Sequence, residues 1–529
     1  MGGVFLIGVD GATFSVLNRL MAAGVMPCMA QLVSRSVRAD LISTPNPFTP
    51  PAWTTMTTGR TPGNHGVFDF VRILKTNGRP SYAMATSMDV KTDTIWEIAS
   101  RAGYRVAALN FPMMFPPRPV NGFVVPGFVP WKYLKKHVYP TSLYDRLATL
   151  PGFAPDQLLF DWDLEREALQ VLPKEKYEQW LRFHIDRERL WASVLLWLMR
   201  EEPCDLTGIV FDGVDKLQHL CWRFLDPDSR QSAASEFEDR VRELCLDYFR
   251  QLDANIGEIL EAAGADAWII VASDHGFGPT SEIFYANVLL HQHGYLEWAG
   301  NAEQDQLGRQ ANEGHRSPLV YFDWARTTAC ALTPGSNGIY FTPRPGFGTA
   351  ASPNSEYRTF RDEVAEVFLS FRHPDDGGQV VTQVLTAEEA FPGRYMDRAP
   401  DLTLVLRDRG FLSVLNSDCV VRSRKEIAGT HNPLGIFLAA GPGISQARVI
   451  DPLHIQDVAS ILLHALGLDV PDEFEGSVPE AFRGFATQSG PKSGYAVATA
   501  KLGRLSNTEV DEDTEAEMIA RLKALGYLE

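Results

Sequence analysis

Short apolar runs recur along the chain, each bounded by polar turns and separated from the next by a stretch with helical spacing. They are VFLIGV from Val4, RVAALN from Arg105, TGIVFD from Thr207, AWIIVAS from Ala267, LTLVL from Leu402 and GIFLAA from Gly435. Continuous apolar strands that alternate with helices are typical of a parallel sheet covered on both faces. The pattern therefore predicts an α/β sandwich around a mostly parallel central sheet.

Two regions interrupt this alternation. Residues 111–202 begin with the proline-rich FPMMFPPRPV and end in a strongly helical pattern, which predicts a mainly helical cap insertion. Residues 279–372, with TPGSNGIYFTPRPGFG, are predicted to form a second insertion. Either insertion could shape a substrate pocket, although aromatic residues at helical spacing more often belong to a core.

The remaining segments are assigned to a core and a tail. Residues 1–110, 203–278 and 373–485 are predicted to form the α/β core. Residues 486–529 are predicted to be a linker followed by an amphipathic helix that begins in an acidic turn. The helix is expected to dock on the body through its apolar positions, which are Ile519, Leu522, Leu525 and Leu528.

The composition is that of an ordinary globular protein, with 45% hydrophobic and 22% charged residues among 529. The net charge of -17 argues against a nucleic-acid polymer as partner, because such proteins usually present a basic face. The first residues, MGGVFLIGVD, do not resemble a secretory signal, and no apolar run approaches membrane-spanning length. We therefore expect a cytoplasmic protein without a membrane partner, whose oligomeric state the sequence does not indicate.

Aspartate and histidine residues follow several predicted strands. Asp10 ends VFLIGV, Asp274 and His275 follow AWIIVAS, and His431 comes just before GIFLAA. One aspartate at a strand end is usually a cap, and one histidine is usually structural. In an open α/β sheet, however, functional residues gather at the carboxyl ends of the strands. The recurrence favours a metal site with oxygen and nitrogen ligands, because the six cysteines have no CxxC spacing.

Asp215 and His219 are four residues apart in GVDKLQH. On a helix this spacing places both side chains on one face, where they could bind the same ion. An exposed pair of helix residues is an equally good interpretation of the spacing alone. Asp212 would face the same side of the helix. We favour Asp215 as the metal ligand, with Asp212 as a residue that contacts the ligands and not the ion.

The stretch TPPAWTTMTTG predicts a short helix, with Thr49 as N-cap, proline at the first helical position and Gly59 as C-cap. The N-terminus of a helix presents free N–H groups and the positive end of the dipole, which suits a phosphate or sulfate oxygen. Thr49 is either a plain N-cap or, beside divalent cations, an activated hydroxyl. Carbonyls inside the helix are expected to bind the other hydroxyls, those of Thr54, Thr55, Thr57 and Thr58.

In their order and spacing, several blocks resemble the alkaline phosphatase superfamily and, within it, the type I phosphodiesterase/nucleotide pyrophosphatase family. The blocks are GVDGA, TPPAWTTMTTGRTPGNHG, FDGVDKLQH, SDHGFGP, GTHNPLGIFLAAGPGI and DPLHIQDVASILLHALGLDVPDEFEG. They cover the core and not the two insertions. The resemblance implies an alkaline-phosphatase-like three-layer sandwich with inserted cap regions.

The resemblance also implies two divalent metal ions, with zinc expected first and manganese or iron as alternatives. By position, one ion is assigned to Asp10, Thr49, Asp274 and His275, and the other to Asp215, His219 and His431. Thr49 is the implied nucleophile, which attacks phosphorus to give a phosphothreonyl intermediate that water then releases.

Two departures bear on the substrate. The family typically has an asparagine after the nucleophile, whereas HGVFDF here has Asp69 and Phe70. Arg60, Asn64 and Lys216 are therefore the candidate partners of the phosphate oxygens. TPPAW has no cysteine or serine in the place of Thr49, which disfavours a formylglycine sulfatase.

The leading hypothesis is a metal-dependent hydrolase of phosphate esters, a phosphodiesterase or nucleotide pyrophosphatase acting on a nucleotide, a nucleotide sugar or another small phospho-conjugate. A phosphomonoesterase, or a phosphoryl, phosphonyl or sulfuryl transferase, would use the same core. A non-catalytic, metal-stabilised binding protein is a third hypothesis, although it needs no nucleophile. The leaving group cannot be predicted, because specificity is expected to reside in the two insertions.

Overall fold

A computed structural model of the chain describes residues 2–76, 79–128, 131–158, 164, 174–229, 235–299, 322–444 and 447–484. These residues fall into two compact units. The first comprises the described parts of Met1–Thr61, Thr86–Phe277 and His431–Val510. The second comprises those of Pro62–Ala85 and Gly278–Thr430.

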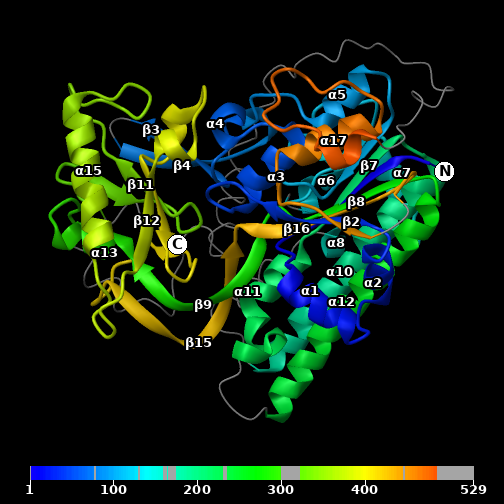
Figure 1. Ribbon diagram of the computed structural model, residues 1–529, viewed down its shortest axis with the longest axis horizontal. Coiled ribbons are helices and arrows are strands. Elements are labelled where there is room, and N and C mark those ends of the chain that lie inside the picture. Colours follow the sequence, from blue (N-terminus) through cyan, green and yellow to red (C-terminus); the bar gives the residue numbers. More distant parts are fainter. Residues whose placement is uncertain are drawn as a thin grey trace. The chain divides into compact units, whose positions relative to one another are not determined.

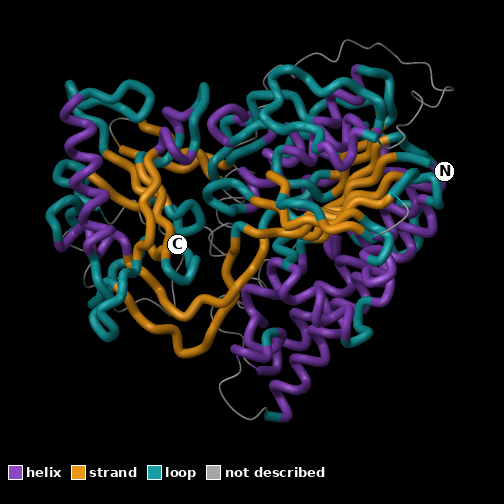
Figure 2. Tube along the Cα trace, in the orientation of Figure 1, coloured by secondary structure: helices purple, strands orange, loops and turns teal. Residues whose placement is uncertain are grey.

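A nine-stranded sheet forms the centre of the first unit (Figure 1, Figure 2). Its central strands β1, β5, β6, β7 and β8 are parallel, whereas β16 is antiparallel to both of its neighbours. Every residue of β1, β7 and β8 is buried, which explains their continuous apolar sequences. The strand order is β17 (Arg448–Val449), β2 (Val37–Ile42), β16 (Leu434–Ala440), β8 (Trp268–Ala272), β1 (Val4–Val9), β7 (Leu206–Phe211), β5 (Val106–Leu109) and β6 (Gly122–Val125), with β18 (Leu453–His454) paired to β2.

Helices cover both faces of this sheet (Figure 1). On one face α3 (Thr49–Thr58), α5 (Ile95–Arg101) and α17 (Asp457–Ala465) pack together. The other face carries α2 (Pro27–Val33), α10 (Lys174–Glu201), α11 (Gly213–Leu225) and α12 (Glu236–Ala263). The predicted three-layer α/β sandwich is thus confirmed. The unit also contains α1 (Phe14–Ala22), α6 (Trp131–His137), α7 (Leu143–Leu147), α8 (Pro155–Leu158) and α18 (Glu480–Arg483).

The second unit contains smaller sheets. Four antiparallel strands lie in the order β10 (Ala329–Ala331), β11 (Gly338–Phe341), β13 (Leu402–Leu406) and β12 (Val381–Thr386). A three-stranded sheet has the order β14 (Leu412–Ser413), β9 (Gly276–Tyr285) and β15 (Val421–Asn432), and β3 (Val71–Thr76) pairs with β4 (Arg79–Met84). Its helices are α4 (Pro62–His65), α13 (Ala286–Gln292), α15 (Ser355–Ser370) and α16 (Ala387–Ala390).

Two predicted strands differ from expectation. The run LTLVL is β13 of the second unit, so its expected place in the main parallel sheet is wrong. The run GIFLAA does join the main sheet, as β16, but in the antiparallel direction. An apolar run indicates that a strand is buried on both faces. It does not indicate which sheet the strand joins or in which direction it runs.

The division into units also differs from the predicted segments. Residues 373–430 group with the second unit, because β12 and β13 pair with β11 and β15 pairs with β9. The described part of residues 111–202 belongs to the first unit, where Trp180 and Trp191 are core residues. The predicted C-terminal linker and helix, 486–529, lie outside the described residues.

None of the described helices is by itself long and apolar enough to cross a membrane. The bent pair of α1 and α2, with 112° between them, passes that test jointly by length and composition only.

Candidate active site

The predicted metal ligands meet at the carboxyl edge of the main sheet. Asp10 follows β1, Asp274 and His275 follow β8, and Asp215 lies in the first turn of α11, after β7. These three strands are neighbours. Because β16 runs antiparallel, its amino end lies at the same edge, and this brings in His431 from the end of β15.

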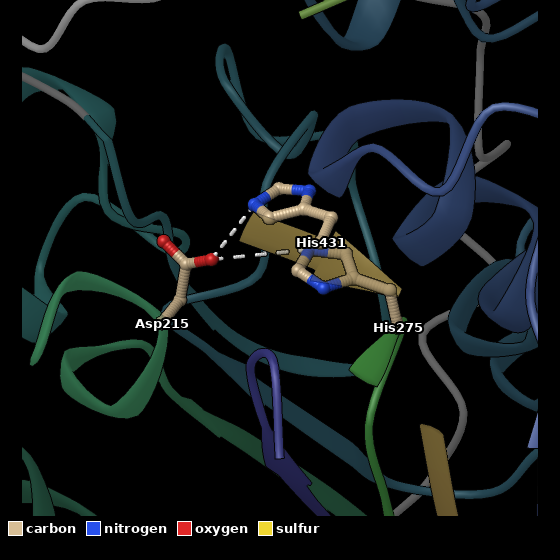
Figure 3. A group of neighbouring side chains, drawn as sticks. All are labelled: Asp215, His275 and His431. Carbon is tan, nitrogen blue, oxygen red and sulfur yellow. Dashed lines mark ion pairs between the residues drawn. The ribbon is translucent and has the colours of Figure 1, made fainter. Parts of the chain in front are cut away.

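The ligand atoms form two contiguous groups. Asp10, Asp274 and His275 form one group and Asp215, His275 and His431 the other, and within each group the atoms lie within 4.8 Å of one another. Figure 3 shows Asp215 facing the rings of both His275 and His431. Because His275 belongs to both groups, the two positions share one buried centre.

His219 extends the second group. Its Nε2 lies 3.5 Å from Asp215 Oδ1 and 3.0 Å from His431 Nε2. The spacing of Asp215 and His219 on α11 therefore brings both side chains to the same place, together with a histidine from far along the sequence. An ordinary exposed helix pair would not have this third partner.

Backbone carbonyls fix the orientation of two imidazoles. His275 Nδ1 lies 3.1 Å from the Gly276 carbonyl, and His431 Nδ1 lies 2.8 Å from the Pro47 carbonyl. A carbonyl can only accept, so each Nδ1 carries the hydrogen and each Nε2 presents a lone pair. These lone pairs face carboxylates, since His431 Nε2 is 3.0 Å from Asp215 Oδ1 and His275 Nε2 is 3.2 Å from Asp274 Oδ2. Facing acceptors fit a cation between them.

Asp10 and Asp274 each have one oxygen held by the protein. Trp53 Nε1 donates to Asp10 Oδ2 at 3.1 Å, and the Gly11 N–H donates to Asp274 Oδ1 at 3.2 Å. When both carboxyls are ionised, their other oxygens, Asp10 Oδ1 and Asp274 Oδ2, have no hydrogen-bond partner among the described residues although they are buried. A buried ionised oxygen of this kind is costly unless a cation compensates it.

The pKa values of the site show the same need. Burial, and then repulsion from Asp274, raises the pKa of Asp10 well above its usual value. Burial, and then Asp215, does the same to the pKa of Asp274. Burial would also raise the pKa of Asp215, and only positive charge on the imidazoles of His219 and His431 would hold it well below its usual value. Crowded carboxylates are thus destabilised as anions until positive charge is supplied.

The histidines of the site are suited to bind metal. Burial lowers the pKa of His275 well below its ordinary value, and burial also lowers that of His431. Both rings are therefore neutral near pH 7, which is the form that binds a metal ion. The donor set of carboxylate oxygens and neutral imidazoles fits zinc, manganese or iron.

Thr49 lies beside these ligands at the start of α3. Its Oγ1 is 3.5 Å from His275 Nε2, and the residue is only 2% exposed. The N-cap of α3 is Phe48, whose extended backbone and carbonyl bond to the Ala52 N–H begin the helix, so the predicted N-cap role of Thr49 is wrong by one residue. Pro50 and Pro51 have no N–H, and Thr49 therefore supplies the one N–H among the first three helical residues.

The rest of α3 agrees with the prediction. Gly59 ends the helix with a left-handed φ of 65°. Each of the other threonine hydroxyls donates to the carbonyl four residues earlier, at 2.6–2.8 Å, in the order Thr54, Thr55, Thr57 and Thr58. These bonds leave Thr49 as the threonine of this helix whose hydroxyl faces the ligands.

Two of the predicted phosphate partners, Arg60 and Lys216, lie in the first unit, and Asn64 lies in the second. Arg60 follows the opposite end of α3 from Thr49, about 15 Å along the helix axis, with its Nε 3.8 Å from Glu475 Oε2. Lys216 follows Asp215 in α11, but its Nζ lies 3.1 Å from Asp212 Oδ2. Asn64 belongs to the second unit, where its Oδ1 accepts from the Arg394 N–H at 3.2 Å.

Sequence reasoning missed three residues that support the site. Trp53 holds Asp10, while Arg187 and Glu188 of α10 contact the residues just before and at the start of α11. No sequence signal set Arg187 and Glu188 apart, because their neighbours Asp186 and Arg189 are also charged. In the structure Arg187 and Glu188 are buried, at 0% and 1% exposure.

Comparison with known proteins gives the family. The sequence profile described as type I phosphodiesterase / nucleotide pyrophosphatase matches residues 4–434. This range contains all seven predicted metal ligands. No curated protein sequence matches the chain.

Solved structures share the fold. Murine ectonucleotide pyrophosphatase/phosphodiesterase 5 has a TM-score of 0.50 at 15% identity, over 89% of this chain and 96% of its own. Its human counterpart has a TM-score of 0.51 at 16% identity, over 90% and 97%. Phosphonoacetate hydrolase from Sinorhizobium meliloti 1021 has a TM-score of 0.52 at 16% identity, over 88% and 95%.

These findings confirm the predicted family and its alkaline-phosphatase-like fold, and with them the predicted enzyme class of phosphoric ester hydrolase. The chain belongs to the type I phosphodiesterase/nucleotide pyrophosphatase family.

Proposed function

We propose that the chain hydrolyses phosphodiester or pyrophosphate bonds in small molecules, with Thr49 as nucleophile and two divalent metal ions, zinc in the first place and manganese or iron as alternatives. The observation that carries the proposal is the arrangement around Thr49 Oγ1. Buried carboxylate oxygens and imidazole lone pairs face one another beside this hydroxyl. A structural or binding role needs no nucleophile at that place.

The ligand residues divide between two ions. Asp10, Asp274, His275 and Thr49 would hold one ion, and Asp215, His219 and His431 the other. Divalent cations at these positions would lower the pKa of a hydroxyl and stabilise negative charge on phosphoryl oxygens. The carbonyls that accept from His275 and His431 keep both rings oriented throughout the reaction.

Thr49 carries the covalent steps. Its Oγ1 gives up its proton to solvent and attacks phosphorus, and the bond to the leaving oxygen breaks, with the electron pair going to the leaving group. Water then attacks the phosphothreonyl group, the bond between phosphorus and Oγ1 breaks, and a proton from the attacking water restores the Thr49 hydroxyl. The Thr49 N–H, at the positive end of α3, is placed to donate to a phosphoryl oxygen.

Related structures support a small substrate. An inactive variant of the murine relative is in complex with AMP, and the Sinorhizobium enzyme is in complex with phosphonoformate or phosphonoacetate. A nucleotide, a nucleotide sugar or a similar phospho-conjugate is therefore the substrate class that we propose. The cytoplasmic location, and the absence of a membrane or nucleic-acid polymer as partner, stay predictions.

An assay panel tests the reaction. The metal-loaded protein is offered aryl phosphate monoesters and diesters, a sulfate ester and nucleotide pyrophosphates, with and without acceptor alcohols. Hydrolysis of diesters or pyrophosphates supports the proposal, monoester hydrolysis alone favours a phosphomonoesterase, and alkyl phosphate products favour a transferase. Thr49→Ala should lose on the order of 10³-fold in kcat.

The matched control is Thr57→Ala, which removes a hydroxyl of the same helix that donates to a carbonyl. It should keep its activity, since Thr57 is not among the ligands. Full activity in Thr49→Ala, or in chelator-treated protein, would show that the mechanism is wrong.

Metal content tests the ligand assignment. Asp215→Asn and His219→Ala should each lose the same ion and keep the other, because their side chains meet at one position. His454→Ala, which changes an exposed histidine, should keep both ions. Unchanged stoichiometry in both site variants would contradict the shared ion.

A further inference from the structure

Helix α10 contacts the start of α11 through two consecutive buried residues with ionisable side chains. Arg187 Nη1 lies 2.6 Å from Asp212 Oδ1, and Glu188 Oε1 accepts from the Gly213 N–H at 2.8 Å. Asp212 precedes α11 and Gly213 is its first residue. Two consecutive residues of one helix thus hold two consecutive residues at the beginning of another.

Asp212 does not cap α11 with its own side chain. Its Oδ1 accepts from Arg187 and from Asn110 Nδ2 at 3.1 Å, and its Oδ2 faces Lys216 Nζ. Arg187 and Lys216 together outweigh burial and hold the pKa of Asp212 below its usual range, so the carboxylate is ionised. The helix terminus is capped instead from outside, by Glu188.

Side chains of α12 and α10 pack closely against Gly213. A Cβ on Gly213 would come within 2.5 Å of Tyr248 Oη of α12 and 2.8 Å of Glu188 Oε1 of α10. The first turn of α11 is therefore tightly packed as well as hydrogen-bonded. That turn contains Asp215, and the next turn contains His219.

We propose that Arg187 and Glu188 are positioning residues for the metal ion assigned to Asp215, His219 and His431, because they fix the first turn of α11 through Asp212 and Gly213. The inference rests on the proposed metal centre. It assigns to α10 a role beyond packing along α12. Residues that orient metal ligands typically change affinity by about 10- to 100-fold when they are replaced.

The experiment measures the affinity of each ion by competition between Co²⁺-loaded protein and a chromophoric chelator. His219→Ala and Asp10→Asn identify which affinity belongs to which ion. Arg187→Met should weaken the ion of Asp215 by about 10- to 100-fold and leave the ion of Asp10 unchanged. Arg189→Met is the matched control, because Arg189 is an exposed arginine of the same helix, and it should change neither affinity.

A second pair of variants covers the case in which Arg187→Met does not fold. Glu188→Gln keeps an oxygen acceptor for the Gly213 N–H and should bind both ions normally, whereas Glu188→Leu should weaken the ion of Asp215 alone. Equal weakening of both ions, or unchanged binding in Glu188→Leu and in any folded Arg187→Met, overturns the proposal. Absence of metal from the wild-type protein would instead overturn the proposed function.

Discussion

Asp69 is a buried carboxyl of the second unit, in the segment where the family typically has asparagine. Its Oδ2 accepts from Thr333 Oγ1 at 2.6 Å, and only 4% of the residue is exposed. Burial raises its pKa to about 7, and the hydrogen bond from Thr333 opposes this only in part. A protonated aspartate has nearly the shape of asparagine, so Asp69→Asn removes the charge with little change in shape.

The stability of the protein should therefore depend on the ionisation of Asp69. Because the pKa is 3.8 in the unfolded chain and about 7 in the fold, the folded state binds the proton more tightly. The resulting stability is complete below pH 3.8 and is lost as the pH rises through 7. Relative to the wild type, Asp69→Asn should gain about 1.4 kcal/mol of unfolding free energy per pH unit between pH 5 and 7.

Urea unfolding of both proteins from pH 5 to 9 measures this difference, which should level off above pH 8. Asp362→Asn, at an exposed carboxylate of the same unit, is the charge control. A difference between Asp69→Asn and the wild type that does not change with pH would rule out a raised pKa.

Individual site residues were predictable where residue type and position agreed. Asp10, Asp274 and His275 stand at strand ends, and the sequence contains that information directly. Arg60 is near Thr49 in sequence, but the length of α3 separates them, and its role as a phosphate partner stays a prediction. Arg187 could not be recognised, since its partner Asp212 becomes a neighbour only when α10 packs on α11.

The contact between β1 and α3 joins a proposed metal ligand, Asp10, to the helix of the proposed nucleophile. A Cβ on Gly8 of β1 would come within 2.4 Å of the Trp53 ring, and Trp53 donates to Asp10. Gly8→Ala should destabilise the protein by about 1–3 kcal/mol and also weaken metal binding, because the displaced indole can no longer hold Asp10.

Thermal unfolding and competition with a chelator measure the two effects of Gly8→Ala. Gly484→Ala is the control, because a Cβ there meets nothing within 4 Å. If Gly8→Ala lowers stability without any change in metal affinity, the contact serves packing alone.

The six apolar runs were predictable as strands, but neither the number of strands nor their pairing was. The run of β16 is as apolar as that of β8, and nothing in either sequence shows that the two strands are antiparallel. His431 lies at the carboxyl edge of β8 because it precedes β16 and β16 runs antiparallel to β8. Strand pairing depends on contacts between distant segments, which a pattern within one segment does not record.

The two units of the chain differ in their relation to the metal site, because all seven predicted ligands lie in the first unit. A bound ion stabilises only the part of the protein that must unfold for the ion to be released. At a free metal concentration a thousand times the Kd, each ion adds about 4 kcal/mol to the unfolding free energy of that part. Metal removal should therefore act on the first unit and leave the second as an internal control.

Hydrogen exchange with and without a chelator tests this division. Metal loading should slow exchange of the amides of β1, β8 and α11, where the ligands are attached, and leave the amides of β11 and β13 unchanged. Metal loading should also release protons in a weakly buffered titration, and more of them at lower pH, because burial raises the pKa values of Asp10 and Asp274 and bound cations favour their ionised forms. Equal protection of the amides of both units would mean that the ions stabilise the chain as a single cooperative unit. Metal binding without proton release would mean that Asp10 and Asp274 are already ionised in the metal-free protein.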